Sequence, residues 1–166
     1  MHASRARGRT LAAWTTALAL PLVALAALAA TEPGKPAKAT PLTDANIVAI
    51  VEVANDGDIK NGMLAEKNGG DAGVKDFGKM MVTDHTSANE KTKALAAKLG
   101  LKPAQDATSR GLVKSANAKH AELSKLSDGA FDHAYMDAEV TMHQAVLDLL
   151  DQKLIPGAKN AELRTS

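Results

Sequence analysis

The fold is decided by residues 43–71, which have the sequence TDANIVAIVEVANDGDIKNGMLAEKNGGD. Apolar side chains recur in this stretch every three or four residues, which is the spacing of one face of an α-helix. Thr43 precedes the first apolar residue and is a favourable N-cap, whereas Gly69 and Gly70 are typical of a helix end. We therefore predict a helix over 44–68.

A second helix is predicted from its cap at Asp71 to about Leu99, with Gly100 as the stop. Because only a pair of glycines separates it from the first helix, the two helices must form an antiparallel hairpin. The inward stripe of the second helix consists of Val74, Phe77, Met81, His85, Ala88, Thr92, Leu95 and Leu99.

The rest of the chain has the same helical periodicity, and no stretch alternates as a β-strand does. The predicted elements are a short helix over 109–126, a long helix from its cap at Ser127 or Asp128 to about Leu154, and the opening of a further helix over 158–164. This order predicts an all-α bundle: a hairpin, a crossover with a short helix, and a second set of helices.

The last predicted helix is short, because the chain reaches only Ser166. We expect one wall of the bundle to be missing and an apolar face to be exposed there or covered by a partner. Such a partner would be a second copy of the chain or another protein of the cell envelope.

The sequence pattern of residues 1–30 indicates an export signal. They combine a basic start containing three arginines, an apolar stretch over 11–30, and the small-residue pattern at 27–29 that signal peptidase needs. The alternative is an uncleaved anchor, since the stretch is about long enough to span a bilayer. Pro21 and the small-residue end favour cleavage, so we expect an exported protein of the periplasm or outer cell envelope.

Residues 31–41 form a proline- and lysine-rich linker, which leaves 42–166 as one small domain. The absence of cysteine excludes disulfides, thiol chemistry and a lipoprotein anchor. The formal net charge of +1 becomes −2 without the signal arginines, and only Phe77, Phe131 and Tyr135 remain as large rings. With no basic stripe and so few aromatic residues, nothing suggests nucleic-acid binding, and any membrane contact would come from an uncleaved signal.

Polar residues interrupt the apolar stripes at Asp58, His85 and Glu139. At about 100° per residue, Asp58 falls within about 20° of the direction that Ile47 sets on the first helix. Glu139 and His143 are four residues apart, so their side chains meet on one helix face. A buried carboxylate is costly unless it is paired, hydrogen-bonded or bound to a metal. The chain must therefore satisfy polar groups inside its bundle.

One interpretation is a metal site, because bundles build such sites from carboxylates and imidazoles that project inward from facing helices. The candidate ligands are Asp58, His85, Glu139 and His143. This donor set suits a divalent ion of iron, manganese, zinc or copper. Asp84 or Asp132 would then act as hydrogen-bond acceptors behind the histidines.

The other interpretation is a buried hydrogen-bond network without a metal. In it, Asp58 accepts a hydrogen bond from His85, and Glu139 accepts one from His143 or Tyr135. Such a network would fix the register of the helices. The residues alone leave both interpretations open.

Four segments resemble bacterial domain-of-unknown-function family 4142: NDGDI at 55–59, LAE at 64–66, VKDFGKMMVTDH at 74–85 and FDHAY at 131–135, the last followed by His143. The resemblance covers roughly 42–164. It implies a ferritin-like up-and-down helical bundle in an exported or outer-membrane protein. The family normally continues into a long last helix with its own histidine, so the resemblance implies that the last helix is truncated here.

From these observations we expect a non-enzymatic, exported helical-bundle protein of the cell envelope, whose buried carboxylate–histidine cluster binds a metal or serves a stress-related role. One alternative is a ferritin-like metalloenzyme that acts on iron or peroxide. Another is a module that binds a partner through an exposed helical face. No catalytic residue is predicted, because ferritin-like oxidase chemistry would need more carboxylates than the sequence places inside.

Overall fold

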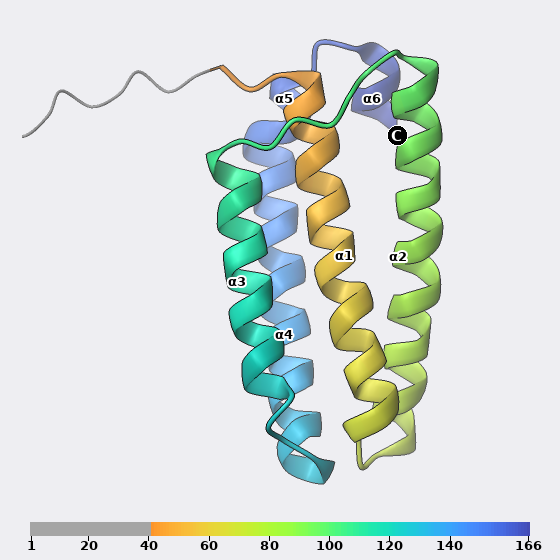
Figure 1. The fold of residues 1–166 in the computed structure, drawn as a ribbon, viewed down its shortest axis with the longest axis vertical. Helices are drawn as coiled ribbons and strands as arrows, with labels where there is room; N and C mark the ends of the chain where they lie inside the picture. Colours follow the sequence, from red (N-terminus) through yellow and green to blue (C-terminus); the bar gives the residue numbers. More distant parts are fainter. Residues whose placement is uncertain (1–40) are drawn as a thin grey trace, which may run out of the picture. The chain divides into compact units, whose positions relative to one another are not determined.

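A computed structural model of the chain describes residues 41–166, so the predicted signal and nearly all of the predicted linker lie outside the described residues. All regular structure in this part is helical, which confirms the all-α prediction (Figure 1). Four long helices run alternately down and up. The elements are α1 (Asp44–Asn68), α2 (Ala72–Lys98), α3 (Ala107–Leu123), α4 (Asp128–Leu149), the π-helical turn η1 (Leu150–Leu154), α5 (Ile155–Gly157) and α6 (Ala161–Thr165).

The α1–α2 hairpin is the most extensive helix pair in the molecule, and its bounds match the predicted ones closely. Thr43 and Asp71 cap the two helices as expected, with side-chain oxygens that accept from backbone amides. A Cβ atom built on Gly62 would lie 2.7 Å from the carbonyl oxygen of Gly78, and one on Gly78 would lie 2.6 Å from Cβ of Ala65. The two helices therefore approach each other at a point where only glycine fits.

The second helix pair begins and ends slightly away from the predicted positions. α3 starts two residues earlier than expected, because Asp106 and Ser109 form a reciprocal capping box. α4 does not continue as a regular α-helix to Leu154. Pro156 has no amide hydrogen to donate, and just before it the amide of Ile155 bonds five residues back to Leu150, which makes a π-helical turn.

The core consists of two apolar halves with a polar layer between them. One half contains Ile47, Ile50, Leu154 and Ala158, and the other contains Ala65, Leu123, Phe131 and Tyr135. Between them along the helices lie the buried polar residues Asn55, Asp58, Asn61, Asn89 and Glu139. Asp58, which interrupts the apolar stripe of the first helix, is thus one part of a continuous polar layer.

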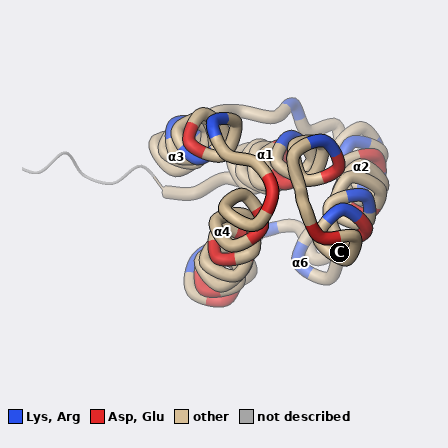
Figure 2. Tube along the Cα trace, turned by 90° about the horizontal axis from the view of Figure 1, so that it is seen from below, with Lys and Arg blue, Asp and Glu red and all other residues tan. Residues whose placement is uncertain are grey.

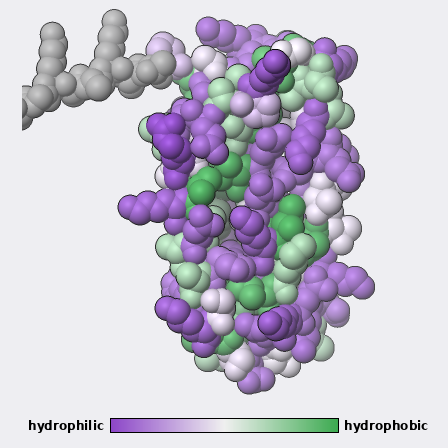
Figure 3. Space-filling model, in the orientation of Figure 1, coloured by the Kyte–Doolittle hydropathy of each residue, from purple (hydrophilic) through white to green (hydrophobic). Residues whose placement is uncertain are grey.

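Seen end-on, α1 lies between α2 and α3, and α6 lies in the space between α4 and α2 (Figure 2). Acidic and basic residues are interspersed on α1 and α2, whereas α4 carries acidic residues but no lysine or arginine. The surface that faces the viewer in Figure 1 is mostly hydrophilic, with small hydrophobic patches between the helices (Figure 3). None of the helices described in residues 41–166 combines the length and the hydropathy needed to cross a bilayer.

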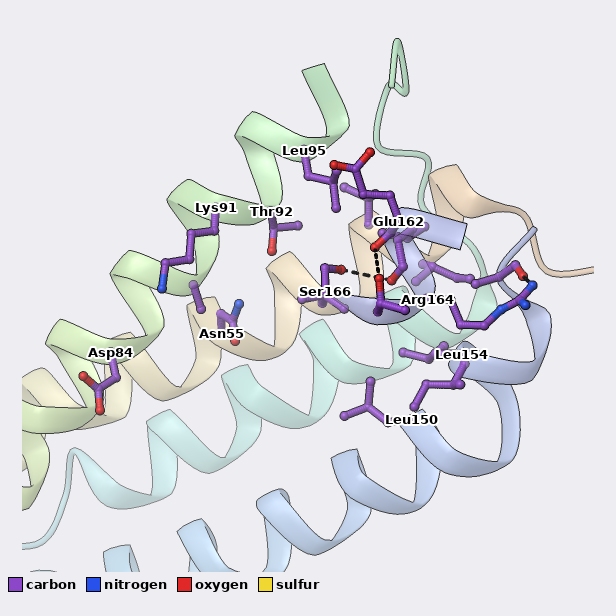
Figure 4. A pocket seen from close by; sticks show the side chains of 18 residues that line it. Asn55, Asp84, Lys91, Thr92, Leu95, Leu150, Leu154, Glu162, Arg164 and Ser166 are labelled. Carbon is purple, nitrogen blue, oxygen red and sulfur yellow. Dashed lines mark hydrogen bonds between the residues drawn. The ribbon is translucent and has the colours of Figure 1, made fainter. Parts of the chain in front are cut away.

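A groove of about 820 Å³ runs along one side of α1 and α2. The C-terminal segment from Leu150 onward forms its other wall, and Leu95, Leu150 and Leu154 point into it alongside the polar Lys91 and Glu162 (Figure 4). The carboxylate of Asp44 holds this segment in place by accepting from the amides that follow α5.

Candidate metal centre

Three helices bring one carboxylate and two imidazoles together in the polar layer. Asp58 of α1, His85 of α2 and His143 of α4 each offer one ligand atom, and these atoms lie within 4.8 Å of one another. Asp58 is only 4% exposed, whereas the side chain of His143 is 43% exposed. The cluster is therefore anchored in the core and reaches solvent on the α4 side.

The two imidazole rings are held by different neighbours. Nδ1 of His85 lies 2.9 Å from Oδ1 of Asn55 and 3.5 Å from Oδ2 of Asp58. Nδ1 of His143 lies 2.9 Å from the backbone carbonyl oxygen of Glu139, one helical turn earlier. The rings meet edge to face with centroids 5.7 Å apart. In each ring, Nδ1 thus has a hydrogen-bond partner, whereas Nε2 has none among residues 41–166.

Glu139, the fourth predicted ligand, lies beside this trio. Its carboxyl group is 3% exposed, and Oε2 is 3.7 Å from Nδ1 of His143, which is too far for a hydrogen bond. That oxygen has no hydrogen-bond partner among the described residues. Burial, reinforced by the negative charge of Asp58, raises the pKa of Glu139 to about 8. The group is therefore mostly protonated at neutral pH.

Burial also raises the pKa values of the acidic groups beside Glu139. It raises the pKa of Asp58, although the charges of His85 and His143 oppose the rise. The pKa of the Tyr135 phenol is raised by burial and by the two nearby carboxylates. The Tyr135 hydroxyl has no hydrogen-bond partner among the described residues. The predicted bonds from Tyr135 and His143 to the carboxylate of Glu139 are not formed.

The two aspartates predicted to support the histidines are used elsewhere. Asp84 is exposed on α2 and lines the groove of Figure 4. The carboxylate oxygens of Asp132 accept from the amides of Gly70 and Asp71, each at 2.9 Å. Asp132 therefore holds the α1–α2 turn, and the structure does not bring it to the cluster.

Asn55 takes the supporting position that was predicted for an aspartate. It lies three residues before Asp58 on the same face of α1, and it contacts Asn89, which lies four residues after His85 on α2. Sequence reasoning missed both asparagines. The signal was available, because residues three or four apart share a helix face with the predicted ligands.

The buried acids also border a second groove, of about 550 Å³, which is lined by Asp58, Glu139 and residues mainly from α3 and α4. Its apolar lining includes Leu112, Ala116, Ala134, Ala138, Met142 and Ala145. The carboxyl groups of the polar layer therefore border a space large enough for a small molecule.

These features define an all-helical bundle with a buried carboxylate–histidine cluster. The chain belongs to the family described as Domain of unknown function (DUF4142), whose model matches residues 28–166. This match confirms the resemblance noted from the sequence segments. No curated protein and no solved structure matches the chain.

Proposed function

We propose that this protein is exported to the cell envelope and binds a divalent transition-metal ion through Asp58, His85 and His143. The proposal is carried by the convergence of one ligand atom from each of these residues within 4.8 Å. Carboxylate and imidazole donors together suit zinc, manganese, iron and copper. The export part of the proposal rests on the N-terminal signal sequence alone.

The unpartnered atoms of the polar layer favour a metal site over a purely structural network. A structural network is expected to satisfy its buried donors and acceptors. Here Oε2 of Glu139 and the hydroxyl of Tyr135 have no partner among the described residues. A cation held by Asp58 and the two histidines would favour the ionised form of Glu139, which would then add a second carboxylate to the site.

Metal analysis and thermal unfolding test the proposal. Protein purified from its native envelope should contain a near-stoichiometric metal, and adding that metal to the chelated protein should raise the unfolding midpoint by mass action. The His85→Ala variant should lose this gain. His133→Ala is the matched control, because His133 is exposed on α4 and should leave the gain intact. If no metal shifts the midpoint, or if His85→Ala responds as the unaltered protein does, the cluster is a structural network.

A second candidate function, a ferritin-like metalloenzyme that acts on iron or peroxide, is favoured by the donor set itself. Two histidines and one carboxylate with open positions are typical of non-haem iron sites. The partial exposure of His143 would leave such positions accessible to solvent. The protein would then oxidise added Fe²⁺ with hydrogen peroxide, which is reduced to water, with turnover that His143→Ala abolishes. Stoichiometric iron without turnover would leave metal binding as the function.

A further inference from the structure

A chain of hydrogen bonds runs from His85 across the α1–α2 interface to the surface. Nδ1 of His85 is 2.9 Å from Oδ1 of Asn55, Nδ2 of Asn55 is 2.9 Å from Oδ1 of Asn89, and Nδ2 of Asn89 is 2.9 Å from Oδ1 of Asp56. The two asparagines are buried, whereas Asp56 is exposed. Each of the three bonds joins side chains of different helices.

The chemistry of Asp56 fixes the direction of this chain. An ionised carboxylate can only accept hydrogen bonds, so Asn89 must turn its NH2 group toward Asp56 and its carbonyl oxygen toward Asn55. Asn55 must then donate its own NH2 group to Asn89 and present its carbonyl oxygen to His85. Flipping either amide would place two donors or two acceptors face to face. Nδ1 of His85 must therefore carry a hydrogen.

We infer that Asp56, Asn89 and Asn55 form a relay that fixes His85 in the Nδ1–H tautomer and leaves Nε2 as its metal-ligating atom. Asp58 is a weaker second acceptor at 3.5 Å from the same Nδ1, so its carboxylate stays available to a metal. The three relay residues are positioning residues, because they act only through His85.

The same tautomer follows for His143 by a different route. Its Nδ1 lies 2.9 Å from the carbonyl oxygen of Glu139, which can only accept. Both histidines of the cluster thus offer Nε2. The backbone fixes one of them, and the asparagine relay fixes the other. A histidine that ligates a metal normally donates its second ring N–H to such a partner, and losing that partner typically weakens metal binding about 10–100-fold.

The consequence for metal affinity rests on the proposed function, but the tautomer can be measured without metal. In chelated full-length protein labelled with ¹⁵N-histidine, at a pH where the imidazoles are neutral, long-range ¹H–¹⁵N spectra report which ring nitrogen is protonated. The His85 signals are identified by their loss in His85→Gln. We expect a proton on Nδ1. A proton on Nε2, or an equal mixture, would overturn the relay. This measurement needs no folded relay variant.

Two substitutions of Asn55 then test whether this residue sets the tautomer of His85. Asn55→Leu removes the acceptor, so His85 should lose its preference for Nδ1–H, and zinc affinity should fall about 10–100-fold. Asn55→Asp again offers an acceptor to Nδ1, so the Nδ1–H tautomer should return, although the carboxylate has no hydrogen to donate to Oδ1 of Asn89. If Asn55→Leu remains folded by circular dichroism and keeps the Nδ1–H form, Asp58 alone sets the tautomer and the relay is wrong.

The two proposals fail separately in this design. Protein that shows the Nδ1–H form but binds no zinc, manganese, iron or copper retains the relay and refutes metal binding. Protein that binds a metal through the cluster but shows the Nε2–H form retains the proposed function and refutes the relay.

Discussion

At the scale of single residues, burial makes the ionisation of the Glu139 carboxyl much less favourable. Its pKa rises from 4.5 to about 8, so between these pH values the folded protein holds a proton that the unfolded chain releases. The free energy of unfolding must therefore fall as the pH rises through this window. The ionised carboxyl of Glu139 therefore opposes folding of the metal-free protein.

Glu139→Gln in the metal-free protein should remove most of this pH dependence, because the amide cannot ionise. We expect the variant to be more stable than the unaltered protein by roughly 2–4 kcal/mol above pH 8, and the difference to disappear near pH 4. Urea unfolding between pH 4 and pH 9 measures it. A smaller slope of the same sign should remain, because burial raises the pKa of Asp58 as well. Parallel stability curves for the two proteins would show that Glu139 ionises freely.

The candidate site could be predicted only as far as helix periodicity reaches. Periodicity places Asp58, His85 and His143 on inward faces, and the structure brings these three together. Periodicity also places Asp132 on the same edge of α4 as Glu139. However, the two residues are seven positions apart, which is about 10 Å along the helix axis. Periodicity gives the direction of a side chain around the helix but not its position along the axis. Asp132 instead accepts hydrogen bonds from the α1–α2 turn.

At the scale of elements, the strongest local signals were also the most accurate. The caps at Thr43 and Asp71 act within a few residues of themselves, so they define the starts of α1 and α2 without help from the rest of the chain. The π-helical turn before Pro156 was not predicted. It depends on how the chain accommodates a missing amide while Leu154 remains in the core.

The close approach of α1 and α2 provides a test of helix packing. Gly78→Ala should destabilise the protein by about 1–3 kcal/mol, because its Cβ would lie 2.6 Å from Cβ of Ala65 and the helices would have to separate. Gly111→Ala on α3 is the control. A Cβ there meets nothing within 4 Å, so the higher helix propensity of alanine should stabilise the protein by about 0.5–1 kcal/mol. Equal effects of the two substitutions in urea unfolding would contradict the packing.

At the scale of the whole molecule, the predicted hairpin and all-helical class were confirmed, but the position of the C-terminal segment could not be foreseen. That position depends on Asp44, whose oxygens lie 2.8 Å and 3.1 Å from the amides of Lys159 and Asn160. These residues are separated by more than a hundred positions in the sequence, and no local pattern links them. Contacts of this kind exist only once the bundle has formed.

The N-terminal segment carries its own prediction. Signal peptidase should cut after the small-residue pattern at 27–29, so the exported protein should begin near Thr31. Intact mass and N-terminal sequencing of protein from the envelope fraction measure the start. Recovery of Met1 in a membrane fraction would mean that the segment is an uncleaved anchor.

The division of the core into two apolar halves has a consequence for cooperativity. The layer around Asp58 and Glu139 contributes little hydrophobic burial, so the segments above and below it are suited to open as separate foldons that share α1. Amide hydrogen exchange in the metal-free protein should then divide into two classes of protection that meet near this layer. A metal ion bound by residues of α1, α2 and α4 would link the two halves, and the amides should then show a single class of protection. Hydrogen exchange at amides far from the ligands would therefore report whether the site is occupied.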